Sequence, residues 1–273
     1  MIIKITPDEL SVLARHIHEI CGIVLDHNKA YLAESRLSPL LEELKLSNYS
    51  ELYFRARTDH EGKINARIIN LISTNETSFF RDRTPFELLK NKLFPEFFSG
   101  GARNISIWSA ACSTGQEVYT TGIILKELLG EKSQTAVKIV GTDISDHAIA
   151  QASYGKYNRI EIERGLPAEK ISAYFTEEAG LYKIRDEIRY MASFKKINLL
   201  EQFISMGKFD LIFCRNVAIY FSPENRKSLF DRLAYQLNHS GILIIGSTES
   251  LFGVSEKFER QEHSGAVYYT LKK

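Results

Sequence analysis

Hydrophobic residues in the first part of the chain follow the spacing of amphipathic helices. The sequence Thr-Pro-Asp-Glu at residues 6–9 provides a cap, a first-turn proline and a capping-box glutamate, and Gly22 ends the segment that it opens. The apolar face of this segment consists of Leu10, Leu13, Ile17 and Ile20. Similar patterns near residues 28–37, 50–57 and 65–72, with no competing strand pattern, predict a small helical domain over residues 1–72. Ser38-Pro39 either kinks the second helix or begins another.

Short apolar runs alternate with helical patterns in the rest of the chain. Residues 84–87 repeat the Thr-Pro-x-Glu arrangement and predict a capped helix that extends towards Phe97. Strand-like runs follow at residues 105–108, 137–140, 209–214 and 242–245, with helical patterns at 116–129, at 145–153 and after Ser222-Pro223. Strands that alternate with helices indicate a parallel sheet covered on both faces. Residues 73–273 are therefore expected to form an α/β domain that ends in a strand at 266–271.

The alternation is interrupted between residues 154 and 200. Tyr182, Ile184, Ile188 and Tyr190 have a period of two around residues 185–187. This spacing predicts a small hairpin, and with it a β-subdomain inserted at about residues 155–195 of the larger domain.

Composition limits the partners and the compartment. Thirty-five basic residues nearly balance thirty-four acidic ones, so the chain has no broad positive field for binding nucleic acid. Three widely spaced cysteines argue against a disulfide framework, and no run approaches roughly 18 uninterrupted apolar residues. The seven histidines form no metal-binding pattern. We expect a cytoplasmic monomer with no metal, no nucleic-acid partner and no direct membrane insertion.

The loop W-S-A-A-C-S-T-G-Q-E-V-Y-T at residues 108–120 lies between a predicted strand and a predicted helix. It holds one glycine, Gly115, whereas a dinucleotide pyrophosphate needs several glycines at fixed offsets. Glu117 in the first helical turn would repel a phosphate and attract a ligand ammonium group. Asp143 ends the next predicted strand, where a carboxylate can accept hydrogen bonds from ribose hydroxyls.

Together the two carboxylates favour S-adenosylmethionine over a nicotinamide dinucleotide. Each residue also has an ordinary structural explanation: Glu117 as a helix-start carboxylate and Asp143 as a cap of the helix that begins near Ser145. Their order at adjacent strand ends favours the ligand.

Several segments resemble the chemotaxis receptor glutamate methyltransferases of the CheR family. These are T-N-E-T-S-F-F-R-D (74–82), W-S-A-A-C-S-T-G-Q-E-V-Y (108–119), G-T-D-I-S (141–145), I-N-L-L (197–200), F-D-L-I-F-C-R-N-V-A-I-Y-F (209–221) and G-S-T-E-S-L (246–251). The resemblance implies a helical N-terminal domain, a Rossmann-like methyltransferase sheet whose last strand is antiparallel, and an inserted β-subdomain. It also implies methyl transfer from S-adenosyl-L-methionine to chemoreceptor glutamates, with S-adenosyl-L-homocysteine as the product.

The resemblance assigns site residues by position. The cofactor contacts it implies are Asn75, Thr77, Arg81, Glu117, Asp143, Asn198, Leu199, Arg215 and Asn216. Tyr220 matches a tyrosine close to the transferred methyl group, although it could instead be a strand-end core residue. As a hypothesis, Arg81 orients the substrate carboxylate or keeps the pocket closed, and Tyr220 fixes the attack geometry by a hydrogen bond.

The resemblance implies the cytoplasmic helical bundle of chemoreceptors as the partner, contacted through a basic N-terminal helix. Here Lys29, Arg36 and Lys45 are interspersed with Glu34, Glu42 and Glu43, which weakens that pattern. The turn within residues 175–182 is short beside that of members which bind a receptor C-terminal pentapeptide, so we expect no pentapeptide tether.

Two alternatives remain. One is a methyltransferase that uses the same cofactor on another substrate, which the balanced charge and the absence of an N-P-P-Y-type motif after Asn216 disfavour. The other is a non-catalytic module that binds S-adenosylmethionine.

Overall fold

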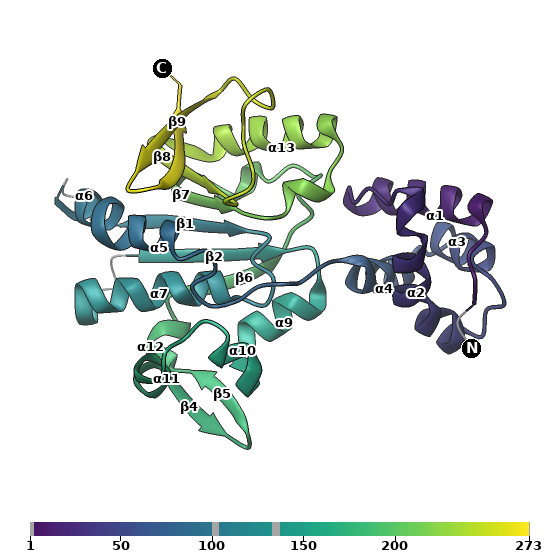
Figure 1. The fold of residues 1–273 in the computed structure, drawn as a ribbon, viewed down its shortest axis with the longest axis horizontal. Helices are drawn as coiled ribbons and strands as arrows, with labels where there is room; N and C mark the ends of the chain where they lie inside the picture. The colour runs from purple at the N-terminus through teal and green to yellow at the C-terminus, as the bar shows by residue number, and fades with distance from the viewer. Residues whose placement is uncertain (1–2, 100–103, 133–136, 273) are drawn as a thin grey trace.

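A computed structural model describes residues 3–99, 104–132 and 137–272 of the chain. Four N-terminal helices stand beside an α/β domain, and a linker that follows the fourth helix runs back to the sheet (Figure 1). The carboxyl ends of the central strands point towards the N-terminal helices. The edge of the sheet where ligands bind in such folds therefore faces the helical domain.

The N-terminal helices are α1 (Pro7–Cys21), α2 (Ala30–Leu44), α3 (Tyr49–Arg57) and α4 (Lys63–Ile72). The capping box predicted for α1 is confirmed, because the Thr6 side chain accepts from the Glu9 N–H and the Glu9 carboxylate accepts from the Thr6 N–H. Gly22 caps the other end with φ of 78°. Pro39 lies inside α2, so Ser38-Pro39 does not begin a new helix.

Helical segments lead from the linker into the sheet: α5 (Thr84–Leu88), a π-helical turn (Leu89–Leu93) and α6 (Phe94–Ser99). The cap predicted at Thr84 is wrong. The N-cap residue is Arg83, which makes no side-chain cap, and the Thr84 hydroxyl donates to the Asp82 carbonyl at 2.9 Å. The linker arrives with φ of 67° at Asp82 and 36° at Arg83, and this backbone turns the chain into α5.

The main sheet has seven strands in the order β6-β2-β1-β7-β8-β10-β9. Their bounds are β1 (Ile105–Ala110), β2 (Val137–Asp143), β6 (Ala192–Lys196), β7 (Phe209–Cys214), β8 (Leu237–Ile245), β9 (Phe258–His263) and β10 (Ala266–Leu271). Strands β6, β2, β1, β7 and β8 are parallel, whereas β10 is antiparallel to both β8 and β9. The expected fold class and the antiparallel last strand are confirmed.

Helices cover both faces of this sheet (Figure 1). On one face, α7 (Gln116–Leu129) buries Val118, Ile124 and Leu125 against Ile107 and other strand residues. On the other, α13 (Pro223–Gln236) packs against Trp108 and its neighbours. Helix α9 (Asp146–Tyr154) follows β2, and the Ser145 hydroxyl accepts from the Ala148 N–H at its start. Alternate strand residues are thus buried on both faces, as a parallel sheet requires.

The insert between α9 and β6 is a small antiparallel sheet with short helices. Its strands β3 (Lys156–Tyr157), β5 (Leu181–Ile184) and β4 (Phe175–Glu178) pair in that order, and α10 (Arg159–Glu163), α11 (Ala168–Tyr174) and α12 (Asp186–Arg189) flank them.

The hairpin position predicted from residues 182–190 is wrong. The β4–β5 turn lies at Ala179 and Gly180, which have φ of 52° and 78°, and residues 186–189 form α12. The apolar residues with a period of two come from two different elements, since Ile184 ends β5 and Ile188 is the buried residue of α12. Residues 192–195, expected in the insert, belong to β6 of the main sheet.

Candidate functional site

One pocket lies at the carboxyl ends of β1, β2, β6 and β7, against the N-terminal helices. It encloses about 920 Å³, including solvent space at its mouth, within the range of small-molecule sites. All ten residues singled out in the sequence line it, namely Asn75, Thr77, Arg81, Glu117, Asp143, Asn198, Leu199, Arg215, Asn216 and Tyr220. Segments far apart in the sequence therefore meet in one site.

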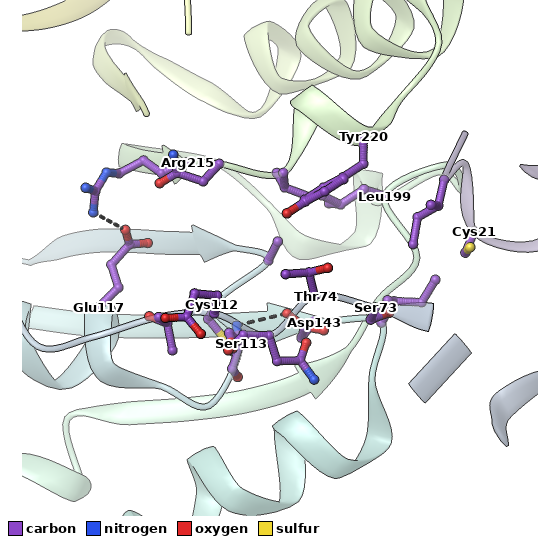
Figure 2. A pocket seen from close by; sticks show the side chains of 18 of the residues that line it. Cys21, Ser73, Thr74, Cys112, Ser113, Glu117, Asp143, Leu199, Arg215 and Tyr220 are labelled. Carbon is purple, nitrogen blue, oxygen red and sulfur yellow. Dashed lines mark hydrogen bonds and ion pairs between the residues drawn. The ribbon is translucent and has the colours of Figure 1, made fainter. Parts of the chain in front are cut away.

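The loop after β1 is tightly folded against the end of β2. Ala111 and Ser113 have φ of 60° and 51°, and Gly115 has φ of 94°. The Ser113 N–H donates to one oxygen of Asp143 at 2.9 Å (Figure 2). The Ser145 N–H donates to the other oxygen at 3.0 Å. A Cβ on Gly115 would lie 3.0 Å from the Ala152 Cβ. The small residues of this loop thus allow the close approach that fixes Asp143 at the pocket.

Asp143 is a buried carboxylate. Desolvation raises its pKa from the ordinary value, and the N–H groups of Ser145, Ser113 and Ile144 oppose this shift by stabilising the charged form. The backbone N–H groups thus hold both carboxylate oxygens of Asp143 in place at the pocket, where they can also accept hydrogen bonds from sugar hydroxyls.

Glu117 belongs to a largely buried charge network. One oxygen accepts from the Ser109 hydroxyl at 2.7 Å, and the other accepts from Arg215 Nη1 at 2.8 Å (Figure 2). Arg215 Nη2 in turn reaches the Asp82 carboxylate at 2.8 Å and the Arg81 carbonyl at 2.9 Å. The Arg215 side chain is 3% exposed, and the carboxylates of Asp82 in the linker and Glu117 in α7 balance its buried charge. This guanidinium fastens the linker to the start of α7.

The linker crosses the pocket between Ser73 and Asp82. Arg81 Nη1 donates to the Glu76 carbonyl at 2.8 Å, and the Ser113 hydroxyl donates to the Asn75 carbonyl at 3.0 Å. The Phe80 N–H donates to the Thr120 hydroxyl at 3.1 Å. These bonds hold the linker over the loop that follows β1.

The N-terminal domain forms part of the pocket wall. Cys21 and Ile23 line the pocket, and the Asn198 amide donates to the Ile20 carbonyl at 2.9 Å. The Val24 N–H donates to the Tyr220 carbonyl at 2.9 Å, next to a β-bridge between Ile23 and Phe221. The end of α1 is thus hydrogen-bonded to the segment that carries Tyr220.

The segment after β7 is held by a carboxylate that the sequence patterns did not single out. Asn216 has φ of 56°, and Glu249 Oε2 accepts from the N–H groups of Asn216 at 2.7 Å and Gly246 at 2.8 Å. Burial raises the pKa of Glu249. A Cβ on Gly246 would lie 2.5 Å from that oxygen, so the glycine leaves the space that Glu249 occupies.

Tyr220 extends over the pocket, across from Ser113 and Asp143 (Figure 2). Within residues 3–99, 104–132 and 137–272, its hydroxyl makes no hydrogen bond. The hydroxyl can therefore bond to a ligand in the pocket.

Sequence patterns missed the contributions of Cys21, Ile23, Asp82 and Glu249. Cys21 and Ile23 come from the other domain, and no pattern in the chain signals how the domains dock. Burial raises the pKa of the Cys21 thiol to about 11 and that of Cys112 well above its ordinary value, so both thiols are protonated at neutral pH. Among the described residues, no cluster of three or more His, Cys, Asp or Glu side chains could hold a metal, and no helix could span a membrane.

The pocket fits S-adenosylmethionine by its donor set. A carboxylate after β1 suits an ammonium group, a carboxylate at the end of β2 suits ribose hydroxyls, and Ile144, Ile197 and Leu199 provide an apolar wall for a base. A doubly wound sheet with an antiparallel last strand and this pocket define an S-adenosylmethionine-dependent methyltransferase.

Comparison with known proteins agrees with this class. Residues 75–267 match the family described as CheR methyltransferase, SAM binding domain, and residues 8–72 match the CheR methyltransferase, all-alpha domain. Chemotaxis protein methyltransferase 1 of Vibrio cholerae is 37% identical over 273 residues, which cover 99% of each chain. Chemotaxis protein methyltransferase Cher2 of Pseudomonas putida is 36% identical over 262 residues, covering 94% of this chain and 95% of that one. The chain belongs to the CheR methyltransferase family, and S-adenosylmethionine is its cofactor.

Proposed function

We propose that the protein transfers a methyl group from S-adenosylmethionine to glutamate side-chain carboxylates of chemoreceptors, giving glutamate methyl esters and S-adenosylhomocysteine. The proposal rests on one observation, that a single pocket holds two kinds of side chain. The carboxylates of Glu117 and Asp143 suit the cofactor, and the hydrogen-bond donors of Arg81 and Tyr220 suit a substrate carboxylate. The relatives named chemotaxis protein methyltransferases support the same substrate class.

The proposed cofactor contacts follow the chemistry of each side chain. Glu117 meets the ammonium group and Asp143 meets the ribose hydroxyls. Asn198 and Leu199 border the adenine. The Asn198 amide already donates to the Ile20 carbonyl and its oxygen accepts from the Leu200 N–H, so we assign Asn198 a shaping role rather than a bond to the base.

The remaining contacts hold the amino-acid end of the cofactor. Asn75, Thr77 and Arg81 come from the linker, and Arg215 and Asn216 come from the end of β7. Because the Arg215 guanidinium is bonded to Glu117 and Asp82, its proposed contribution is to keep Glu117 in place.

Methyl transfer to a glutamate carboxylate requires mainly that the reacting atoms be held in the correct positions. A glutamate with a reference pKa of about 4.3 is ionised at neutral pH, so no general base is required. The carboxylate oxygen forms a bond to the methyl carbon while the carbon–sulfur bond breaks and its electron pair stays on sulfur, and no proton is transferred. The cofactor supplies an electrophilic methyl group on a positively charged sulfur. Alignment of the reacting atoms can contribute roughly 7–11 kcal/mol.

Two residues are proposed to provide this alignment. The Arg81 guanidinium uses Nη1 on the Glu76 carbonyl, which leaves other N–H groups to orient the substrate carboxylate. The Tyr220 hydroxyl can donate a hydrogen bond to the same carboxylate and fix its direction of approach.

The proposed partner is the helical bundle of a chemoreceptor, met by a monomer at the mouth of the pocket. Of the basic residues considered for this contact, Arg36 donates to the Ser73 carbonyl and the Thr74 hydroxyl, so it supports the linker. Lys29 lies 3.7 Å from Asp26. The β4–β5 turn is two residues long, Ala179 and Gly180, and we propose that the enzyme works without a pentapeptide tether.

A labelling experiment tests the proposal. The protein is incubated with methyl-labelled S-adenosylmethionine and membranes that carry chemoreceptors, and protein-bound label is then exposed to mild alkali. The proposal predicts label that alkali releases, because methyl esters hydrolyse. Alkali-stable label would indicate transfer to another group, and cofactor binding without any label would indicate a binding module. Arg81→Ala and Tyr220→Phe are each expected to slow labelling; full turnover in both would remove their assigned roles.

A further inference from the structure

The linker that carries Asn75, Thr77 and Arg81 is anchored in the insert. The Phe79 side chain is 1% exposed and packs in a cluster formed by α7 and by insert residues. Its ring meets Tyr157 edge-on at 5.1 Å between centroids and Phe175 at 5.5 Å. Aromatic pairs of this geometry stabilise beyond their buried area. Phe79 thus ties the cofactor-binding linker to β3 and β4.

The backbone of the insert touches the linker at the same place. A Cβ on Gly165 would lie 1.9 Å from the Phe79 carbonyl oxygen, so only glycine fits there. The neighbouring Arg164 forms an ion pair with Glu76. Arg81 donates to the Glu76 carbonyl at 2.8 Å, so Arg164 holds the residue on which Arg81 rests.

The insert also holds the loop after β1. The Tyr157 hydroxyl donates to the Thr114 carbonyl at 2.8 Å. Thr114 follows Ser113, whose N–H donates to Asp143 and whose hydroxyl donates to the Asn75 carbonyl. The loop is therefore bonded to the insert through Tyr157 and to the linker through Asn75.

We infer that the insert has a task in cofactor binding: Tyr157, Arg164 and Gly165, none of which lines the pocket, are positioning residues for the two segments that hold S-adenosylmethionine. The insert therefore sets cofactor affinity without any contact with the cofactor. This inference concerns cofactor binding and is independent of the group that receives the methyl.

A matched pair of arginines tests it. Arg164 and Arg159 both lie at α10 with exposed side chains, 53% and 74% respectively, but Arg159 pairs with Glu163 inside the same helix. Arg164→Ala is expected to weaken S-adenosylhomocysteine binding by a factor of about two to five, the scale of one exposed ion pair. Arg159→Ala is expected to leave it unchanged, and Arg164→Lys to restore part of the loss, with isothermal titration calorimetry on the full chain as the measurement.

Tyr157→Phe separates positioning from folding, and Gly165→Ala tests the backbone contact with Phe79. Tyr157→Phe keeps the ring that Phe79 packs against and removes only the bond to Thr114, so it should fold and still bind S-adenosylhomocysteine more weakly. Gly165→Ala forces the Phe79 carbonyl to move and should weaken binding more than Arg164→Ala. In both, the KM for S-adenosylmethionine should rise more than kcat falls.

The inference is overturned if Arg164→Ala and Tyr157→Phe fold as the parent does and bind S-adenosylhomocysteine with unchanged affinity. Equal losses in Arg159→Ala and Arg164→Ala would also overturn it, because they would reflect a general effect of charge on the insert. Binding of the product requires no receptor, so a failed receptor-methylation assay would not affect this result.

Discussion

At the residue scale, Glu117 serves two partners in the proposed account. It receives Arg215 in the structure, and it is proposed to receive the ammonium group of the cofactor. A largely buried carboxylate next to a buried guanidinium is costly to remove, because the remaining charge loses its partner. A loss of affinity in a Glu117 variant could therefore come from either partner, and a second variant is needed to separate them.

Glu117→Gln should weaken the binding of S-adenosylmethionine and of S-adenosylhomocysteine to a similar extent, because both ligands carry the ammonium group. The expected loss of affinity is about ten-fold or more, since charge-assisted hydrogen bonds contribute about 1.5–3 kcal/mol. Asp82→Asn removes the other charged partner of Arg215 and leaves Glu117 in place, so its effect should be smaller. Calorimetric titration measures both. Equal losses would mean that Glu117 acts only through Arg215, and no loss would make it a helix-start carboxylate.

The ionisation of the Asp143 carboxyl group should make cofactor binding depend on pH. Its pKa is raised by burial, and the ionised form is the better acceptor for ribose hydroxyls. Binding should therefore release protons, and affinity should fall as the pH drops through this pKa, which burial raises from the ordinary value of an aspartate. Titrations at several pH values test this, and Asp143→Asn should remove that part of the dependence. A parent profile that matches the variant at every pH would contradict the assignment.

The meeting of Glu117 and Asp143 in one pocket could be predicted from the sequence, because each follows a predicted strand and parallel strands end at one edge. Glu249 could not be found in this way. It reaches Asn216 from the loop after β8, and that contact depends on the tight turn that Gly246 allows.

At the scale of elements, the contact between α1 and the Tyr220 segment predicts a difference between two glycines. Gly22 and Gly62 have φ of 78° and 69°, so alanine at either should cost about 1–2 kcal/mol of stability. A Cβ on Gly22 would lie 3.1 Å from the Phe221 ring, whereas nothing lies within 4 Å of one on Gly62.

Gly22→Ala should therefore also slow methyl transfer, because it displaces the neighbour of Tyr220, whereas Gly62→Ala should not. Urea unfolding measures the stability of each variant, and turnover at saturating cofactor measures its rate of methyl transfer. Equal turnover in the two variants at similar stability would show that the end of α1 does not influence the Tyr220 segment.

Elements with a clear apolar pattern were predicted well, and polar edge elements were not. The predicted bounds of α7, β7 and β10 match the structure, since each is rich in buried or half-buried apolar residues. Strands β6 and β9 were missed because they are edge strands, with mostly exposed residues and little apolar alternation. The hairpin was displaced because a buried isoleucine of α12 continued the period of β5.

At the scale of the whole molecule, the pocket has walls from both domains and is braced by the insert. The fold class could be read from the alternation of strands and helices, whereas the docking of the helical domain could not, because it depends on bonds such as that from Asn198 to the Ile20 carbonyl.

The proposed lack of a pentapeptide tether makes a prediction about the receptor. A chemoreceptor truncated by its last five residues should be methylated at the rate of the intact receptor, because the bundle alone is the proposed contact. Initial rates of label incorporation at low receptor concentration compare the two. A several-fold slower rate on the truncated receptor would show that the C-terminal residues are bound.

The most direct measurement of the central claim is the identification of the methylated atom. A chemoreceptor incubated with the protein and S-adenosylmethionine is digested and its peptides are sequenced by tandem mass spectrometry. The account predicts one added methyl group on glutamate side chains, absent after mild alkali and strongly reduced with Tyr220→Phe. Methyl groups only on lysine, arginine or another side chain, or none on a receptor whose glutamates are accessible, would contradict it.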